Sequence, residues 1–186
     1  MKTLALDQSL NNTGWAVFSD KELTSHGVIK IQKDGVLQDR LLSLVQEVSQ
    51  LIESEDIGKV VIEDIQMQID KETQQKVYGE GNIVNVSTFK TLAQVQGALL
   101  ALFADKEVPS DIYHSSAWKS SCGIVGAHRQ EQKRSAQVYI EKKYGVKAIQ
   151  DTVDAICLGE HAVNIGREKP KEKTVVKNEY APISWD

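Results

Sequence analysis

The sequence is poor in cysteine and contains no long apolar segment. Its two cysteines, Cys122 and Cys157, lie far apart and fit neither the spacing of a zinc site nor a disulfide framework. We expect both to be packed thiols, which suits a reducing cytoplasm. No apolar run approaches the roughly 20 residues of a transmembrane helix, and the N-terminus lacks the long apolar region and cleavage site of a signal peptide. These absences predict a cytoplasmic protein without a membrane partner.

The composition is otherwise that of an ordinary globular protein, with 41% hydrophobic and 26% charged residues in a chain of 186. A chain of this length is expected to form one domain and to bury roughly two thirds of its surface. We place this domain at residues 1–166. Residues 167–186 are charged and contain two prolines, which is typical of a tail that docks late or stays disordered.

Negative charge predominates, but it is unevenly distributed. The net charge of −4 argues mildly against a nucleic-acid-binding protein. Residues 114–147, however, contain seven basic residues against two acidic ones, a local charge of +5 that leaves about −9 for the remainder. Because the local field matters more than the total, this segment can engage phosphates.

The hydrophobic pattern predicts an α/β protein. Two apolar runs within residues 3–18 flank a polar loop with asparagines and a glycine, which predicts a β-hairpin. Further strands are expected at residues 23–31, 59–65 and 111–114, the second of these dense in β-branched residues like a buried parallel strand. Helices are expected at residues 36–55, from 85 or 87 to 105, at 130–144 before a terminating Gly145, and from Asp151 onward. Residues 66–84 are expected to form a loop that either touches substrate or has no role, and residues 115–129 a loop punctuated by glycines.

Acidic residues stand at the ends of these elements. Asp7 ends the first strand, where a carboxylate is costly to bury unless it is paired or binds a cation. Glu63 and Asp64 end the fourth strand and point to opposite faces, so one of them could share a site with Asp7. Asp151 and Asp154 are three residues apart and project from one face of a first helical turn. Taken singly, Asp7 could cap a turn, Asp151 could be a helix N-cap and Asp154 could favour the helix dipole.

The acidic residues also stand in motifs that resemble those of a known family. The element order resembles the RNase H-like fold, a mixed five-stranded sheet flanked by helices. The opening run from Asp7 through Asn11-Asn12-Thr13-Gly14-Trp15 to Val17 resembles the first motif of RuvC Holliday junction resolvases, and phage-encoded members most of all. Val61-Ile62-Glu63 and Asp151-Thr152-Val153-Asp154-Ala155 match that family's second acidic strand and closing helix. The family usually has Pro-Gly after the first aspartate, where this chain has Gln8-Ser9. We expect this departure to affect sequence preference and the choice of junction more than the chemistry of cleavage.

Four crowded carboxylates predict a metal site. Like charges repel unless cations neutralise them, and ligands that are all oxygen favour Mg²⁺ or Mn²⁺ over zinc. Two ions could then clamp a scissile phosphate. We expect Asp7 to bridge both ions, with Glu63, Asp151 and Asp154 as the remaining ligands.

The resemblance further implies a structure-selective DNA endonuclease that resolves four-way junctions by paired phosphodiester hydrolysis. It implies that Lys119 and Lys133 contact the phosphate backbone or stabilise transition-state charge. Arg129, Arg134 and Tyr78 are further candidates for DNA binding, Tyr78 or Phe89 by stacking on an opened base. A homodimer through the helix at residues 87–105 is also implied, because a junction has approximate two-fold symmetry.

Other functions remain open at the level of sequence. The same fold could support a broad flap or branched-DNA nuclease, or an RNase H. A junction-binding module without catalysis would not need the four acidic residues. An actin-like ATPase would need two such domains and a chain about twice as long, so it is the weakest alternative.

Overall fold

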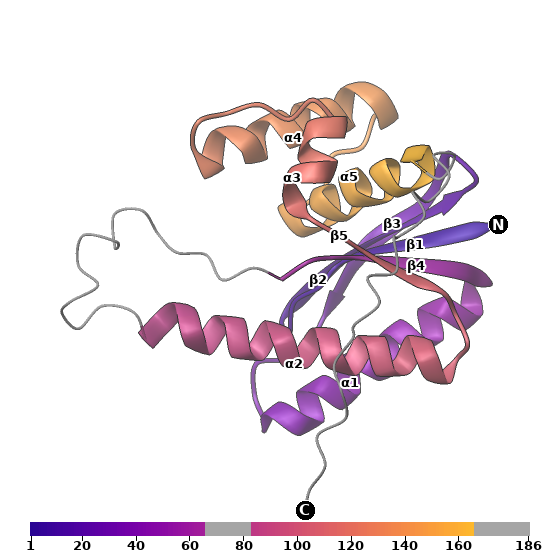
Figure 1. Cartoon of the computed structure of the whole chain (residues 1–186), viewed down its shortest axis with the longest axis vertical. Helices are drawn as coiled ribbons and strands as arrows, with labels where there is room; N and C mark the ends of the chain where they lie inside the picture. The colour runs from indigo at the N-terminus through magenta and orange to yellow at the C-terminus, as the bar shows by residue number, and fades with distance from the viewer. Residues whose placement is uncertain (66–82, 166–186) are drawn as a thin grey trace, which may run out of the picture.

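The computed structural model describes residues 1–65 and 83–165 of the chain. Five strands form one mixed sheet in the order β3-β2-β1-β4-β5 (Figure 1). They are β1 (Lys2–Asp7), β2 (Asn12–Ser19), β3 (Glu22–Lys30), β4 (Ile57–Glu63) and β5 (Ser110–Tyr113). Strand β2 pairs antiparallel with both β1 and β3, whereas β1, β4 and β5 run parallel to one another. The carboxyl ends of β1 and β4 therefore meet at one edge of the sheet.

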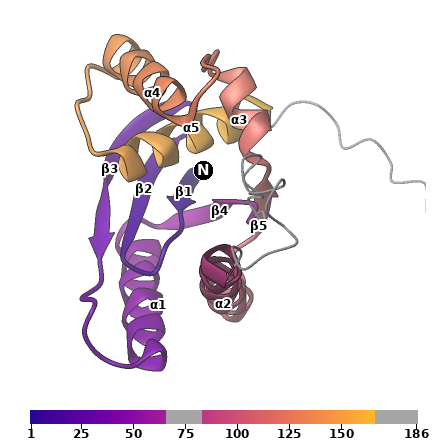
Figure 2. The same ribbon diagram turned by 90° about the vertical axis from the view of Figure 1, so that its left-hand side faces the viewer.

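Helices cover both faces of this sheet. The helices α1 (Leu37–Ser54) and α2 (Ile83–Asp105) pack on one face, and α3 (Ser115–Ser121), α4 (Arg129–Tyr144) and α5 (Gln150–Ile165) pack on the other (Figure 2). The central helix of the second group, α5, lies directly against the sheet. This arrangement confirms the predicted five-stranded mixed sheet flanked by helices. None of the described helices is both long and apolar enough to cross a membrane.

The alternation of side chains along β1 and β4 separates the two cores. Leu6 belongs to the core under α1 and α2, whereas Ala5 and Val61 belong to the core under α3, α4 and α5. Because side chains alternate with a period of two, Asp7 follows Ala5 and Glu63 follows Val61. Both acidic side chains are thus directed to the face that carries α5.

The structure departs from the predicted elements at several boundaries. Residues 115–121 form a helix instead of a loop, because the indole of Trp118 is inserted into the core beside α5 and is only 2% exposed. Helix α2 begins at Ile83, inside the segment predicted to be a loop, and β4 runs from Ile57 to Glu63 rather than over residues 59–65. The predicted helix end at Gly145 is confirmed by its left-handed φ of 69°. The remainder of the predicted loop, with Tyr78, and the predicted tail at residues 167–186 lie outside the described residues.

Candidate active site

The first two acidic residues meet where β1 and β4 end. The strands pair in parallel as far as Leu6 and Ile62, so Asp7 and Glu63 follow at equivalent positions. Asp64, the alternative to Glu63, does not line the cavity at this edge, and its main-chain N–H donates to the carbonyl of Tyr113 on β5 at 2.8 Å. The prediction that one of the two would share a site with Asp7 is therefore fulfilled by Glu63.

The other two acidic residues are brought in by the first turn of α5. Asp7 is paired across the ladder with Gly14 of β2, and the backbone of Asp151 lies directly on that glycine. A Cβ atom at Gly14 would lie 1.9 Å from the carbonyl oxygen of Asp151, so no other residue permits this approach. A hydrogen bond also holds the start of α5 to the sheet: the hydroxyl of Thr152 donates to the carbonyl of Gly27 on β3 at 2.9 Å.

The position of Asp151 corrects one prediction. Helix α5 begins at Gln150, so Asp151 lies inside the first turn and is not the N-cap. The helix starts earlier because Val153 already donates its N–H to the carbonyl of Ile149 at 3.0 Å. The carboxylate of Asp151 therefore does not act as the N-cap of α5. It lines the cavity together with Asp154.

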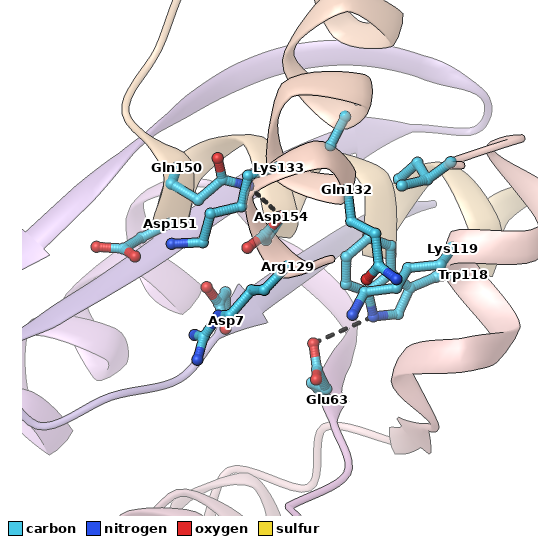
Figure 3. A pocket seen from close by; sticks show the side chains of 12 residues that line it. Asp7, Glu63, Trp118, Lys119, Arg129, Gln132, Lys133, Gln150, Asp151 and Asp154 are labelled. Atoms are coloured by element: carbon cyan, nitrogen blue, oxygen red, sulfur yellow. Dashed lines mark hydrogen bonds between the residues drawn. The ribbon is translucent and has the colours of Figure 1, made fainter. Parts of the chain in front are cut away.

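All four predicted carboxylates line one cavity of about 380 Å³ (Figure 3). Three of the predicted cationic residues also line it, namely Lys119, Arg129 and Lys133. Arg134 does not line it and is exposed elsewhere on α4, so the structure does not bring it to the site. The complete lining consists of Asp7, Glu63, Trp118, Lys119, Ile124, Arg129, Gln132, Lys133, Ala136, Gln150, Asp151 and Asp154.

Two of the carboxylates are held by side chains that the sequence analysis did not single out. The indole Nε1 of Trp118 donates to Glu63 at 3.1 Å, and the amide Nε2 of Gln150 donates to Asp154 at 2.7 Å (Figure 3). The spacing of Gln150 and Asp154, one helical turn, is a signal that the sequence did contain. Trp118 stands next to Lys119 in the sequence, but its contact with Glu63 depends on tertiary packing.

Burial and mutual repulsion raise the pKa values of three of these carboxyl groups. Burial raises the pKa of Asp7 well above its ordinary value, and the charges of Asp154, Glu63 and Asp151 raise it further. Burial also raises the pKa of Glu63 and of Asp154, against the opposing hydrogen bonds from Trp118 and Gln150. This pattern is typical of functional sites, where charge is concentrated at the expense of stability.

Three cationic side chains face the carboxylates across the cavity. Lys119 lowers the pKa of both Glu63 and Asp154, Lys133 lowers that of Asp154, and Arg129 lowers that of Asp7. Within residues 1–65 and 83–165, none of the three forms an ion pair with a carboxylate. Their charge is therefore available to an anion that enters the cavity.

Acidic residues near these cations are engaged elsewhere. Glu131 accepts hydrogen bonds from the main-chain N–H groups of Ala127 at 2.8 Å and His128 at 3.4 Å, so it caps the start of α4. Glu141 pairs with Lys147 at 2.9 Å, close to the other end of that helix. Glu131 and Glu141 are therefore engaged by partners other than Arg129 and Lys133 at the start of α4.

The donor set at this site suits hard divalent cations. The four candidate ligands offer only carboxylate oxygens, which Mg²⁺, Mn²⁺ and Ca²⁺ prefer to softer ligands. Two carboxylates 4 Å apart repel by about 4 kcal/mol at an effective dielectric constant of 20, which a cation between them would offset. In the described part of the chain, no three acidic, histidine or cysteine side chains are already grouped tightly enough to hold an ion. The carboxylates of Glu63 and Asp154, which accept hydrogen bonds from Trp118 and Gln150, would have to draw closer around one.

Comparison with known proteins agrees with this arrangement. Among solved structures, RuvC of Thermus thermophilus in complex with a Holliday junction substrate has a TM-score of 0.64 at 15% identity, covering 89% of this chain and 96% of that one. The Fowlpox virus resolvase, solved with Holliday junction DNA, has a TM-score of 0.54 at 12% identity, covering 90% and 100%. The yeast mitochondrial Holliday junction resolvase has a TM-score of 0.54 at 14% identity, covering 87% and 77%.

Sequence comparison identifies the family directly. No curated protein sequence matches the chain, but the sequence profile of the crossover junction endodeoxyribonuclease RuvC matches residues 3–159. This range includes all four carboxylates and all three cations of the cavity. The chain therefore belongs to the RuvC family and is a junction-resolving endonuclease with an RNase H-like fold.

Proposed function

We propose that the cavity between β1, β4 and α5 is the catalytic centre of this endonuclease. Four carboxylates from three separate elements line it together with three cationic side chains, and this observation carries the proposal. Asp7, Glu63, Asp151 and Asp154 would together hold two divalent cations, Mg²⁺ or Mn²⁺. When bound, the two ions would lower the pKa of the attacking water and neutralise charge on the leaving 3′ oxygen.

The protein side chains have distinct tasks in this scheme. Lys119 and Lys133 would contact the non-bridging oxygens of the scissile phosphate, because both lie on the wall facing the carboxylates. Lys119 is kept in place by the indole of Trp118, whose ring centroid lies 5.3 Å from its Nζ atom. Arg129 would bind a neighbouring phosphate. No side chain is required as a covalent nucleophile.

The substrate we propose is branched DNA, in particular the four-way junction. The exposed Arg134, beyond the cavity on α4, could extend the phosphate contacts, and Tyr78 could stack on an opened base. Two sites on opposed strands require a two-fold dimer. We place its interface on α2, which has only two charged residues, Lys90 and Asp105, among its 23. The two free cysteines, both buried, are in keeping with a reducing cytoplasm.

Cleavage of defined DNA substrates tests this proposal. Labelled synthetic four-way junctions, 5′ flaps and linear duplexes would be incubated with Mg²⁺, Mn²⁺ or EDTA at one stated salt concentration. The expected result is paired, symmetric nicks in the junction, which disappear in EDTA and in Asp7→Asn. Asp7→Asn should still bind the junction, because it removes a charge from the centre without touching the cationic wall.

The same experiment separates the remaining alternatives. Cleavage of flaps as well as junctions would make the chain a general nuclease for branched DNA. Binding without cleavage at any metal concentration would refute the proposed catalytic centre and favour a junction-binding module.

A further inference from the structure

Gln8 follows Asp7 in the chain and makes two hydrogen bonds to the main chain of Glu63. Its Nε2 donates to the carbonyl oxygen of Glu63 at 2.5 Å, and its Oε1 accepts from the N–H of Glu63 at 3.2 Å. The side chain is buried, with only 5% of its surface exposed. A glutamine in this position links the strand ends that carry two of the four carboxylates.

The reason for this contact lies in the sheet. The parallel ladder between β1 and β4 ends at Leu6 and Ile62, because Asp7 is the last residue of β1 and pairs only with Gly14 of β2. The N–H and carbonyl of Glu63 would otherwise be left without β1 partners at a half-buried edge, which is costly. A primary amide offers the same donor and acceptor as a peptide group. The side chain of Gln8 thus extends the ladder by one residue after the backbone has turned away.

Glu63 therefore has contacts at both its main chain and its carboxylate. Gln8 holds its main chain, and Trp118 holds its carboxylate at 3.1 Å. The contact from Gln8 does not engage the carboxylate oxygens, so they remain able to bind a cation. A residue that anchors a ligand without occupying its oxygens acts as an outer-shell support.

We propose that Gln8 is a positioning residue that holds Glu63 beside Asp7 and thereby sets the affinity of the carboxylate cluster for divalent cations. This inference rests on the proposed function, because it assigns Glu63 as a metal ligand. It adds a residue that touches neither metal nor DNA. Without Gln8, the end of β4 would keep its pairing with β5 but lose the two hydrogen bonds that connect Glu63 to the end of β1.

Direct titration with Mn²⁺ tests the inference without relying on cleavage. Isothermal titration calorimetry would compare the full-length wild type with Gln8→Leu, which removes both hydrogen bonds at similar volume, and with Gln8→Asn, which keeps the amide but is one methylene too short. The dissociation constant for Mn²⁺ should rise about 10-fold or more in both variants, the range seen when outer-shell partners are removed. Binding of a four-way junction in EDTA should change less than about 2-fold, because the cationic wall is untouched.

Controls distinguish positioning from a purely structural role. Gln38→Leu, at an exposed position in α1, should leave the Mn²⁺ affinity unchanged. Thermal unfolding in EDTA would be measured for every variant. A lower Tm with wild-type Mn²⁺ affinity in Gln8→Leu would overturn the proposal, and if that variant does not fold, the same result in Gln8→Asn would overturn it. Failure of the proposed function would look different: the wild type would bind no Mn²⁺, or Asp7→Asn would bind it as well as the wild type.

Discussion

Gly14→Ala should disable the enzyme while leaving every charged residue of the site in place. Gly14 pairs with Asp7 on the neighbouring strand and lies beneath the backbone of Asp151 at the start of α5. The added methyl group would lie 1.9 Å from the carbonyl oxygen of Asp151 and 2.7 Å from the nitrogen of Thr152. The φ angle of Gly14 lies outside the left-handed range, so alanine fits the local backbone, and the three atoms nearest to its methyl group all belong to the start of α5.

The size of the effect follows from this contact. To restore even a tight 3.0 Å separation, the first turn of α5 would have to move by about 1 Å. Displacement of a catalytic group by 1 Å can reduce the rate about 100-fold. Overpacking of this kind lowers the free energy of unfolding by about 1–3 kcal/mol, which the protein is expected to survive. Gly14→Ala should therefore fold and bind a junction, yet cleave it about 100-fold more slowly because Asp151 and Asp154 have moved away from Asp7.

Single-turnover cleavage of a four-way junction, with thermal unfolding measured in parallel, is the appropriate assay. Gly58→Ala is the matched control. It lies at the start of β4, and the nearest obstacle to its Cβ atom is the side chain of Met1 at 2.8 Å, which is 72% exposed and free to turn away. Cleavage by Gly58→Ala should be close to that of the wild type. Wild-type cleavage by Gly14→Ala would refute the reasoning, because the approach of α5 would then not determine the site.

Three further predictions concern charge. Glu63→Gln and Asp154→Asn should each abolish cleavage while preserving junction binding; a variant that cleaves at nearly the wild-type rate would show that its carboxylate is not a ligand. Lys133→Ala should slow cleavage and reduce the slope of log affinity against log salt by about one; an unchanged rate and slope would make this lysine an ordinary surface residue. Finally, burial and three carboxylate neighbours raise the pKa of Asp7 well above 3.8 in the folded chain, so the folded metal-free protein retains a proton that the unfolded chain releases. Its free energy of unfolding in EDTA should therefore decrease as the pH rises from about 4 through that raised pKa, and denaturant titrations of Asp7→Asn should show a flatter dependence. An equally steep dependence in that variant would exclude Asp7 as its source.

The main elements of the fold could be predicted because their signals are local. The β-branched run before Glu63 and the apolar stripe of α1 have the periods of a strand and a helix, and neither depends on distant residues. Gly145 ends α4 in the left-handed conformation that a helix end requires. Helix α3 was missed because its sequence is rich in serine, which favours turns and caps. Its helical structure depends instead on the burial of Trp118 against α5.

The candidate site was predictable only in part. The carboxylates stood out because acidic residues at the ends of apolar strands are unusual, and Lys119, Arg129 and Lys133 were found from the resemblance and the basic segment. Their supporting residues gave a weaker signal. Gln8 and Trp118 act on Glu63 from 55 residues away along the chain, and no periodicity or motif connects positions so far apart.

The linear sequence shows which groups could carry the chemistry: four carboxylates at element ends, a basic helix, and the order of strands and helices. Those properties depend on residue type and local periodicity, which the linear chain contains in full. Only the tertiary structure places the start of α5 against Gly14 and next to Asp7, extends the ladder to Glu63 through Gln8, and leaves Arg134 outside the lining of the cavity. These outcomes depend on distances between strands and helices that are distant in sequence, and only the packed core fixes them.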